Sequence, residues 1–327
     1  MSFADTGHPL ANGVTGTCLT VPTRTPASYR EAITAPDSAP VGVLGAQLFL
    51  PDGKGPWSVV TVVPGSLGVA PSHLAKADFL TDAGIAALVI DPFGRRGVES
   101  TVANQAQYSF AASAWDVLAA TSFLAGRPEI DASRIGAQGH SRGGTAVLMA
   151  ATMQHLVPVG GPPNAGRPNT GRPNLRGVYA AYPWSGHQFL RPHVGGTAVR
   201  SVIGDADEWC SPQQVQAHMH AIRLVGADAT FRLVAGAQHS FDRDTPVELI
   251  EDAAIAPAAP TGYLDDEGTF VHPLADAPDP EVTERDLMVY GMKSGAGRRG
   301  ARIGSGPGEA ALFHADMMAF WARVLAA

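Results

Sequence analysis

Charged residues and basic surface are scarce in this 327-residue chain. Asp, Glu, Lys and Arg make up only 16% of it, whereas 45% of the residues are hydrophobic, so the chain can bury a sizeable core. A net charge of −7 provides no basic field for a nucleic acid or an anionic membrane. No apolar run reaches the roughly 18 residues of a membrane span. We therefore predict a folded protein that acts on small molecules and is cytoplasmic by default, with export after removal of a signal peptide left open.

Cysteine is also rare, which limits both disulfides and metal sites. Cys18 and Cys210 can form at most one bridge and have no zinc-ligand spacing, so we interpret them as free thiols. His218 and His220 face different directions on a predicted helix. The GAGRRG string at 295–300 follows no predicted strand, as a dinucleotide site would require. The sequence thus predicts no metal and no cofactor.

From residue 41 onward, β-rich apolar runs alternate with helix-like stretches. This alternation is typical of a mainly parallel sheet covered by helices on both faces, so the predicted fold class is α/β. The predicted strands are 41–51, 57–63, 85–91, 134–140, 177–183, 198–204 and 229–236. Helices are predicted over 106–125, 143–157 and the last twenty residues, where apolar side chains recur at helical spacing.

Three segments fall outside this alternation. Residues 1–40 precede it as an N-terminal extension. Residues 158–175 contain GRPN twice, and their glycine and proline content predicts a surface loop. Residues 245–308 are first acidic and then rich in glycine and arginine, with too few apolar residues for a separate core. We predict that 245–308 is an irregular insertion before the C-terminal helix of a single domain spanning 1–327.

The sharpest motif is GHSRGG at 139–144, between a predicted strand and a predicted helix. A serine at the tip of such a turn takes a strained backbone and projects its hydroxyl, while Gly139 and Gly143 avoid collisions with neighbouring elements. Ser141 is therefore the candidate nucleophile. The amide of Arg142 begins the helix and is a candidate donor to an oxyanion. The alternative is a glycine-rich turn with no chemistry.

A serine hydroxyl becomes nucleophilic only when an oriented base removes its proton. Asp207 and His239 each follow a predicted strand, so both lie at the edge where open α/β sheets bind ligands. The order Ser, Asp, His is the one that this architecture uses. Asp205 competes for the role of the acid, but Asp207 is better placed to reach the histidine. A solvated loop histidine is the alternative for His239.

Together, these motifs resemble the α/β-hydrolases of the dienelactone hydrolase type. The resemblance covers PGSLG at 64–68, DPFGRRG at 91–97, the elbow at 139–144, GDAD at 204–207 and HSFD at 239–242. It implies the α/β-hydrolase fold, with Ser141 as nucleophile, Asp207 as orienting acid and His239 as general base. Dienelactone hydrolases proper use a cysteine nucleophile, so the serine shifts the expected substrate toward a carboxylic ester.

The second oxyanion donor is expected in the loop after the strand at 57–63. Gly65 and Gly68 allow the backbone to approach a substrate closely, so the amide of Leu67, or else that of Ser66, is the candidate. The alternative is an ordinary glycine turn.

Several further residues are candidates for substrate contacts. Arg95 and Arg96 suit a bidentate clamp on a substrate carboxylate, or equally a salt bridge to the protein's own acids. An apolar pocket is predicted from aromatic residues in loops, with core packing as the alternative. These aromatic residues are Trp184, Phe189 and Trp209. His140 is predicted to point away from Ser141 and to pack.

The sequence thus predicts a serine hydrolase that cleaves a small-molecule carboxylic ester or lactone through an acyl-enzyme. The same triad also suits a peptidase, a thioesterase or an acyltransferase. A different class of function, a catalytically inactive small-molecule-binding protein, keeps the fold without the chemistry. Association into a homo-oligomer is left open.

Overall fold

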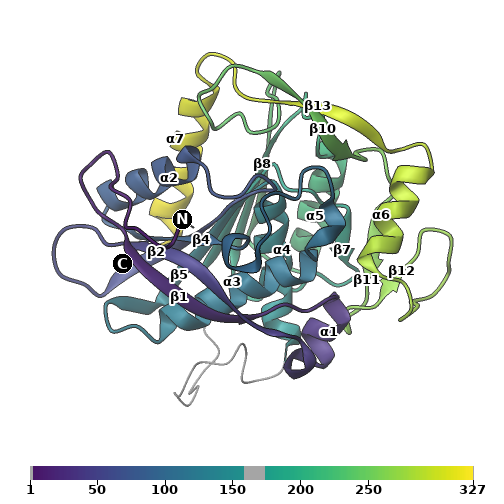
Figure 1. Ribbon diagram of the computed structural model, residues 1–327, viewed down its shortest axis with the longest axis horizontal. Helices are drawn as coiled ribbons and strands as arrows, with labels where there is room; N and C mark the ends of the chain where they lie inside the picture. The colour runs from purple at the N-terminus through teal and green to yellow at the C-terminus, as the bar shows by residue number, and fades with distance from the viewer. Residues whose placement is uncertain (1–2, 158–173, 327) are drawn as a thin grey trace.

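The computed structural model describes residues 3–157 and 174–326 and centres on an eight-stranded sheet (Figure 1). Its strand order is β1-β2-β4-β3-β5-β6-β8-β9. Strands β1 (Thr17–Arg24) and β2 (Val41–Phe49) are antiparallel to their neighbours, and the remaining strands are parallel. Those strands are β3 (Trp57–Val63), β4 (Ala86–Asp91), β5 (Ile130–His140), β6 (Gly177–Ala181), β8 (Ala198–Gly204) and β9 (Ala229–Val234). The predicted α/β fold class is confirmed.

Helices cover both faces of this sheet, as the alternation of side chains along β5 shows. A Cβ on Gly139 would meet the backbone of Gly143 in α4, whereas one on Gly136 would meet the ring of Trp321 in α7. Because odd and even residues of a strand face opposite sides, α4 and α7 cover opposite faces. Helix α3 packs on α4, and α2 packs on α7. The bounds are α2 (Pro71–Asp82), α3 (Phe110–Ala125), α4 (Arg142–Leu156), α5 (Pro212–Leu224) and α7 (Glu309–Val324).

Residues 1–40, predicted as an N-terminal extension before the alternating pattern, add an edge strand to the main sheet. Strand β1 pairs with β2 along its whole length as the edge strand of the main sheet, and α1 (Tyr29–Thr34) follows it. The side chain of Thr23 donates a hydrogen bond of 2.7 Å to Asp116 in α3, which attaches the strand to the core. Pro22 obscures the strand in the sequence, although an edge strand tolerates proline.

The prediction that 245–308 is an irregular insertion is wrong. It contains β10 (Glu248–Ile255), β11 (Gly262–Leu264), β12 (Phe270–Val271), α6 (Glu284–Lys293) and β13 (Arg298–Ile303). Strands β10 and β13 pair with each other, and β11 pairs with β7 (His187–Phe189) of the main body. Figure 1 shows these elements grouped along one side of the molecule. Their few apolar side chains join the main hydrophobic core, so the segment needs no core of its own.

Three other expectations concern local features. The predicted loop at 158–175 lies outside the described residues, apart from positions 174 and 175. Cys18 and Cys210 are both free thiols, as interpreted from the sequence. None of the described helices combines the length and the apolar character needed to cross a membrane.

Candidate active site

Ser141 occupies a strained turn between β5 and α4. Its φ of 55° and ψ of −118° lie in a region that side chains rarely adopt, and its amide donates a 3.0 Å hydrogen bond to the carbonyl of Ala181. A Cβ on Gly139 would lie 1.9 Å from a backbone oxygen, and one on Gly143 would lie 2.3 Å from another. Only glycine fits at these two positions, so the motif at 139–144 forms the strand–turn–helix elbow that its sequence predicts.

His239 and Asp207 form a buried pair at the ends of β9 and β8. Nδ1 of His239 lies 2.8 Å from Oδ2 of Asp207, and both side chains are almost fully buried. The other carboxylate oxygen accepts the amides of Trp209 at 2.8 Å and Cys210 at 2.9 Å. The carboxylate is therefore held rigidly, and it favours the tautomer whose Nε2 is free to accept a proton.

The competing acid, Asp205, takes a different role. Its carboxylate accepts the amide of Gly236 at 2.6 Å and is exposed to solvent. This contact closes the turn beside β9, so Asp205 shapes the loop and Asp207 is the residue that reaches His239.

Ser141 and His239 line the same small cavity of about 30 Å³. Ser66 and Leu67 line it as well. Within the described residues no hydrogen bond joins the serine hydroxyl to the imidazole. Catalytic hydrogen bonds are often loose without a substrate and tighten when one is bound, so the shared cavity is compatible with proton transfer.

Aromatic rings hold the imidazole of His239 on two sides. The ring of Tyr182 lies edge-on at a centroid distance of 4.7 Å, and that of Trp209 stacks at 5.3 Å. The end of β13 contacts both the loop that carries Asp207 and the loop that carries His239. Trp209 Nε1 donates a hydrogen bond to the carbonyl of Arg302, and the amide of Gly304 donates one to the carbonyl of His239. The segment 245–308 is thus part of the site.

The backbone around Ser141 offers candidate oxyanion donors. The Arg142 amide is the first of α4, so it has no acceptor inside the helix. Leu67 and Ser66 lie in the turn that begins at Gly65, where a Cβ would come within 3.1 Å of the Ser141 Cβ. This close approach brings the turn against Ser141, where the sequence predicts the second donor.

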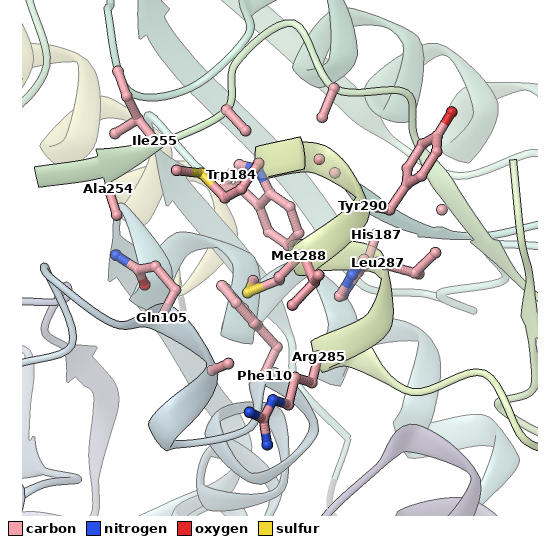
Figure 2. A pocket seen from close by; sticks show the side chains of 18 of the residues that line it. Gln105, Phe110, Trp184, His187, Ala254, Ile255, Arg285, Leu287, Met288 and Tyr290 are labelled. Carbon is pink, nitrogen blue, oxygen red and sulfur yellow. The ribbon is translucent and has the colours of Figure 1, made fainter. Parts of the chain in front are cut away.

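A larger cavity of about 420 Å³ opens beside the serine and is lined by both Ser141 and Ser66. Trp184 and Trp209 line it, as predicted, and α6 of the segment 245–308 covers it. Figure 2 shows Trp184 and Met288 of α6 among the side chains that line this space. The walls are mainly apolar, which suits the hydrocarbon part of a small molecule.

Two contacts that the sequence did not reveal build this cavity. The buried Arg142 guanidinium donates to the carbonyl of Gln105 at 3.1 Å and stacks 3.9 Å over the Phe110 ring. The Glu284 carboxylate of α6 accepts the amides of Phe110 and Ala111, at 2.7 and 3.0 Å, and so caps α3. The first of these bonds spans 174 positions of the chain, and no local sequence pattern indicates it.

Three candidate substrate contacts are wrong. Arg95 pairs with Asp5 at 2.7 Å, and Arg96 forms a bidentate pair with Asp116 at 2.9 Å. Phe189 is only 2% exposed and lies in the core. None of the three lines the cavities beside Ser141. Both arginines form salt bridges with acidic residues of the protein itself, which is the alternative that the sequence left open.

His140 packs in the core on the face opposite α4, as predicted. Its ring lies 5.0 Å from that of His73, and burial lowers its pKa to about 3, so it stays neutral.

Asp207, Cys210 and His239 also bring three potential metal-ligand atoms within 4.8 Å of one another. Both oxygens of Asp207 already accept hydrogen bonds, and burial raises the pKa of the Cys210 thiol. A protonated thiol is a poor ligand. The donor set therefore suits an acid–base pair better than a metal ion.

Known proteins are similar to this chain in a segment of its sequence and in its overall structure. The prolyl oligopeptidase family model matches residues 71–157, from α2 through the elbow into α4. No curated protein matches the chain. A dienelactone hydrolase-like promiscuous phosphotriesterase from metagenomic libraries matches in structure with a TM-score of 0.50 and 20% identity, over 70% of this chain and 85% of that one. This protein therefore has the α/β-hydrolase fold.

Two other solved structures are similar at lower scores. A dienelactone hydrolase from Anabaena variabilis has a TM-score of 0.47 and 19% identity, over 68% of this chain and 88% of that one. Esterase 2 of Thermogutta terrifontis, phosphoramylated by tabun, has a TM-score of 0.48 and 17% identity, over 61% and 80%.

Proposed function

We propose that this protein is a serine hydrolase that cleaves a carboxylic ester or lactone through an acyl-enzyme. One observation carries the proposal: the strained Ser141 and His239, which is paired with the buried Asp207, line one small cavity beside a larger apolar one. The α/β-hydrolase fold supports it, because this fold places a nucleophile, an acid and a base at the same edge of the sheet.

The reaction uses each group in turn. Ser141 attacks the ester carbonyl while His239 takes its proton, and Asp207 stabilises the resulting imidazolium. The amides of Arg142 and of Leu67 or Ser66 stabilise the tetrahedral oxyanion. His239 then protonates the leaving alcohol, and water repeats the sequence on the acyl-enzyme to release the acid. The apolar cavity of about 420 Å³ holds the hydrocarbon part of the substrate.

Labelling by a fluorophosphonate tests the proposal directly. The wild-type protein should form one phosphonylated adduct, seen as a mass increase on Ser141, and Ser141→Ala should form none. A wild-type protein that neither reacts nor hydrolyses p-nitrophenyl esters of any chain length would instead be a binding protein that kept only the fold.

A peptidase is the second candidate, favoured by the match of 71–157 to the prolyl oligopeptidase family. Among the described residues no Asp or Glu lines the cavity of about 420 Å³, so this lining offers no carboxylate partner for the protonated amino terminus of a peptide. This favours the ester. Parallel assays with p-nitroanilides and p-nitrophenyl esters of the same acyl group separate the two activities, and added alcohols or amines reveal acyl transfer.

A further inference from the structure

A fully buried ion pair lies behind the imidazole of His239. Lys76 of α2 pairs with Oδ2 of Asp242, and the two side chains are 0% and 1% exposed. The hydroxyl of Tyr182, at the end of β6, donates a 2.5 Å hydrogen bond to Oδ1 of the same carboxylate. The three side chains therefore join α2, the central sheet and the loop after β9.

This network adjoins His239 in two ways. Asp242 lies three positions after His239, and between them Ser240 has a φ of 60°, so the loop turns sharply. Tyr182 has a φ of 36°, and its ring lies edge-on against the imidazole at 4.7 Å. The network thus fixes both the loop that carries the imidazole and one wall beside it.

Burying two charges is costly, and a pair of well-packed apolar side chains would often stabilise a core as well or better. What a buried network provides instead is one defined geometry. We propose that Lys76, Asp242 and Tyr182 are positioning residues, which hold the imidazole of His239 in the orientation that reaches the Ser141 hydroxyl. This inference rests on the proposed function.

A matched network on the same strand provides the control. Tyr179 of β6 is also fully buried, and its hydroxyl donates a 3.0 Å hydrogen bond to Asp316 of α7. Asp316 pairs in turn with Arg200. Neither Tyr179 nor Asp316 lines the cavities beside Ser141. The two tyrosines thus have the same kind of partner, but only Tyr182 contacts His239.

The experiment compares Tyr182→Phe with Tyr179→Phe. Each variant keeps its ring and loses one buried hydrogen bond, so both should unfold at a lower temperature. Tyr182→Phe should also lower kcat and the rate of fluorophosphonate labelling by about tenfold, with KM changed less than about twofold. Tyr179→Phe should leave kcat and labelling unchanged. Equal effects of the two variants on kcat would overturn the inference.

A second measurement does not depend on turnover. The Cε1–H resonance of His239 should split or broaden in Tyr182→Phe, as the ring samples more than one orientation, and stay single in Tyr179→Phe. Asp242→Asn and Asp316→Asn extend the comparison to the carboxylates. Absent labelling of the wild type contradicts the proposed function, whereas unchanged His239 spectra and kcat in Tyr182→Phe contradict the positioning role alone.

Discussion

At the scale of single residues, the position of Ser141 depends on neighbours that have no side chain. Gly139 and Gly143 let β5 and α4 meet at the elbow, and Gly65 lets the candidate oxyanion turn touch it. Gly139 and Gly143 are required for the fold, because a Cβ at either position would collide with backbone atoms. Gly65 has more room, so a substitution there should lower activity rather than stability.

Gly65→Ala tests this distinction. The new Cβ would lie 3.0 Å from the carbonyl oxygen of His140 and 3.1 Å from the Ser141 Cβ, so the turn must move away by a few tenths of an ångström. We expect kcat for a p-nitrophenyl ester to fall roughly 10- to 100-fold, because small displacements of catalytic groups are costly. Gly196→Ala, where a Cβ meets nothing, is the control. Wild-type kcat in Gly65→Ala would place the second oxyanion donor elsewhere.

The choice between two acids is also a residue-scale question. Asp207→Asn keeps the shape of the side chain but removes the charge that fixes the His239 tautomer, so kcat should fall by about 10,000-fold. Asp205→Asn keeps an acceptor for the Gly236 amide and should retain most activity. Steady-state kinetics of the two variants decide the assignment, and the reverse ranking would make Asp205 the acid.

At the scale of elements, Glu284 attaches α6 to the first turn of α3. This contact holds α6 over the larger cavity. Burial raises its pKa to about 7, although the two amides that it accepts oppose the shift. The folded protein therefore holds a proton on Glu284 that the unfolded chain, with an ordinary carboxyl pKa, releases nearer pH 4.5. Stability from this group is present at low pH and declines as the pH rises toward 7.

Glu284→Gln should remove that dependence. Between about pH 5 and 8 the wild type should lose on the order of 2–3 kcal/mol of unfolding free energy through this group, and the variant should lose less. Denaturant unfolding at both pH values measures the difference. Glu281→Gln, an exposed change in the same segment, should behave like the wild type. Identical slopes for wild type and Glu284→Gln would show that the buried carboxyl is already ionised.

Local pattern explains which elements the sequence could predict. The parallel strands are buried on both faces and read as continuous apolar runs, and the elbow is contiguous in the chain. The sequence does not predict β1, because this strand contains a proline. It does not predict β10 to β13 either, because they have few apolar residues of their own and pack on the main core. The Glu284 cap and the pairing of Arg96 with Asp116 join distant segments. Such contacts depend on the tertiary fold, which periodicity does not specify.

At the scale of the whole molecule, the charge of the cavity contrasts with that of the chain. The protein has a net charge of −7, but in the part of the chain that the structure describes no acidic residue lines the cavity of about 420 Å³. The described lining includes the cationic residues Arg142, Arg285, Lys293 and Arg299. Within the described residues neither Arg285 nor Lys293 makes an ion pair. The guanidinium of Arg142 is buried and donates to the carbonyl of Gln105, whereas Arg285, Lys293 and Arg299 are exposed, so we expect these three to give the exposed side of the cavity a positive potential.

This potential should favour a substrate whose apolar acyl chain ends in a carboxylate. Of two p-nitrophenyl esters with equal chain length, one neutral and one ending in a carboxylate, the anionic ester should have a kcat/KM several-fold higher at low salt. Added salt should shrink that advantage, because it screens exposed charges. Arg285→Gln and Arg299→Gln should lower kcat/KM for the anionic ester alone. Arg298→Gln, next to Arg299 but outside the lining, is the control. If the neutral ester is preferred at every salt concentration, the entrance charges do not select the substrate.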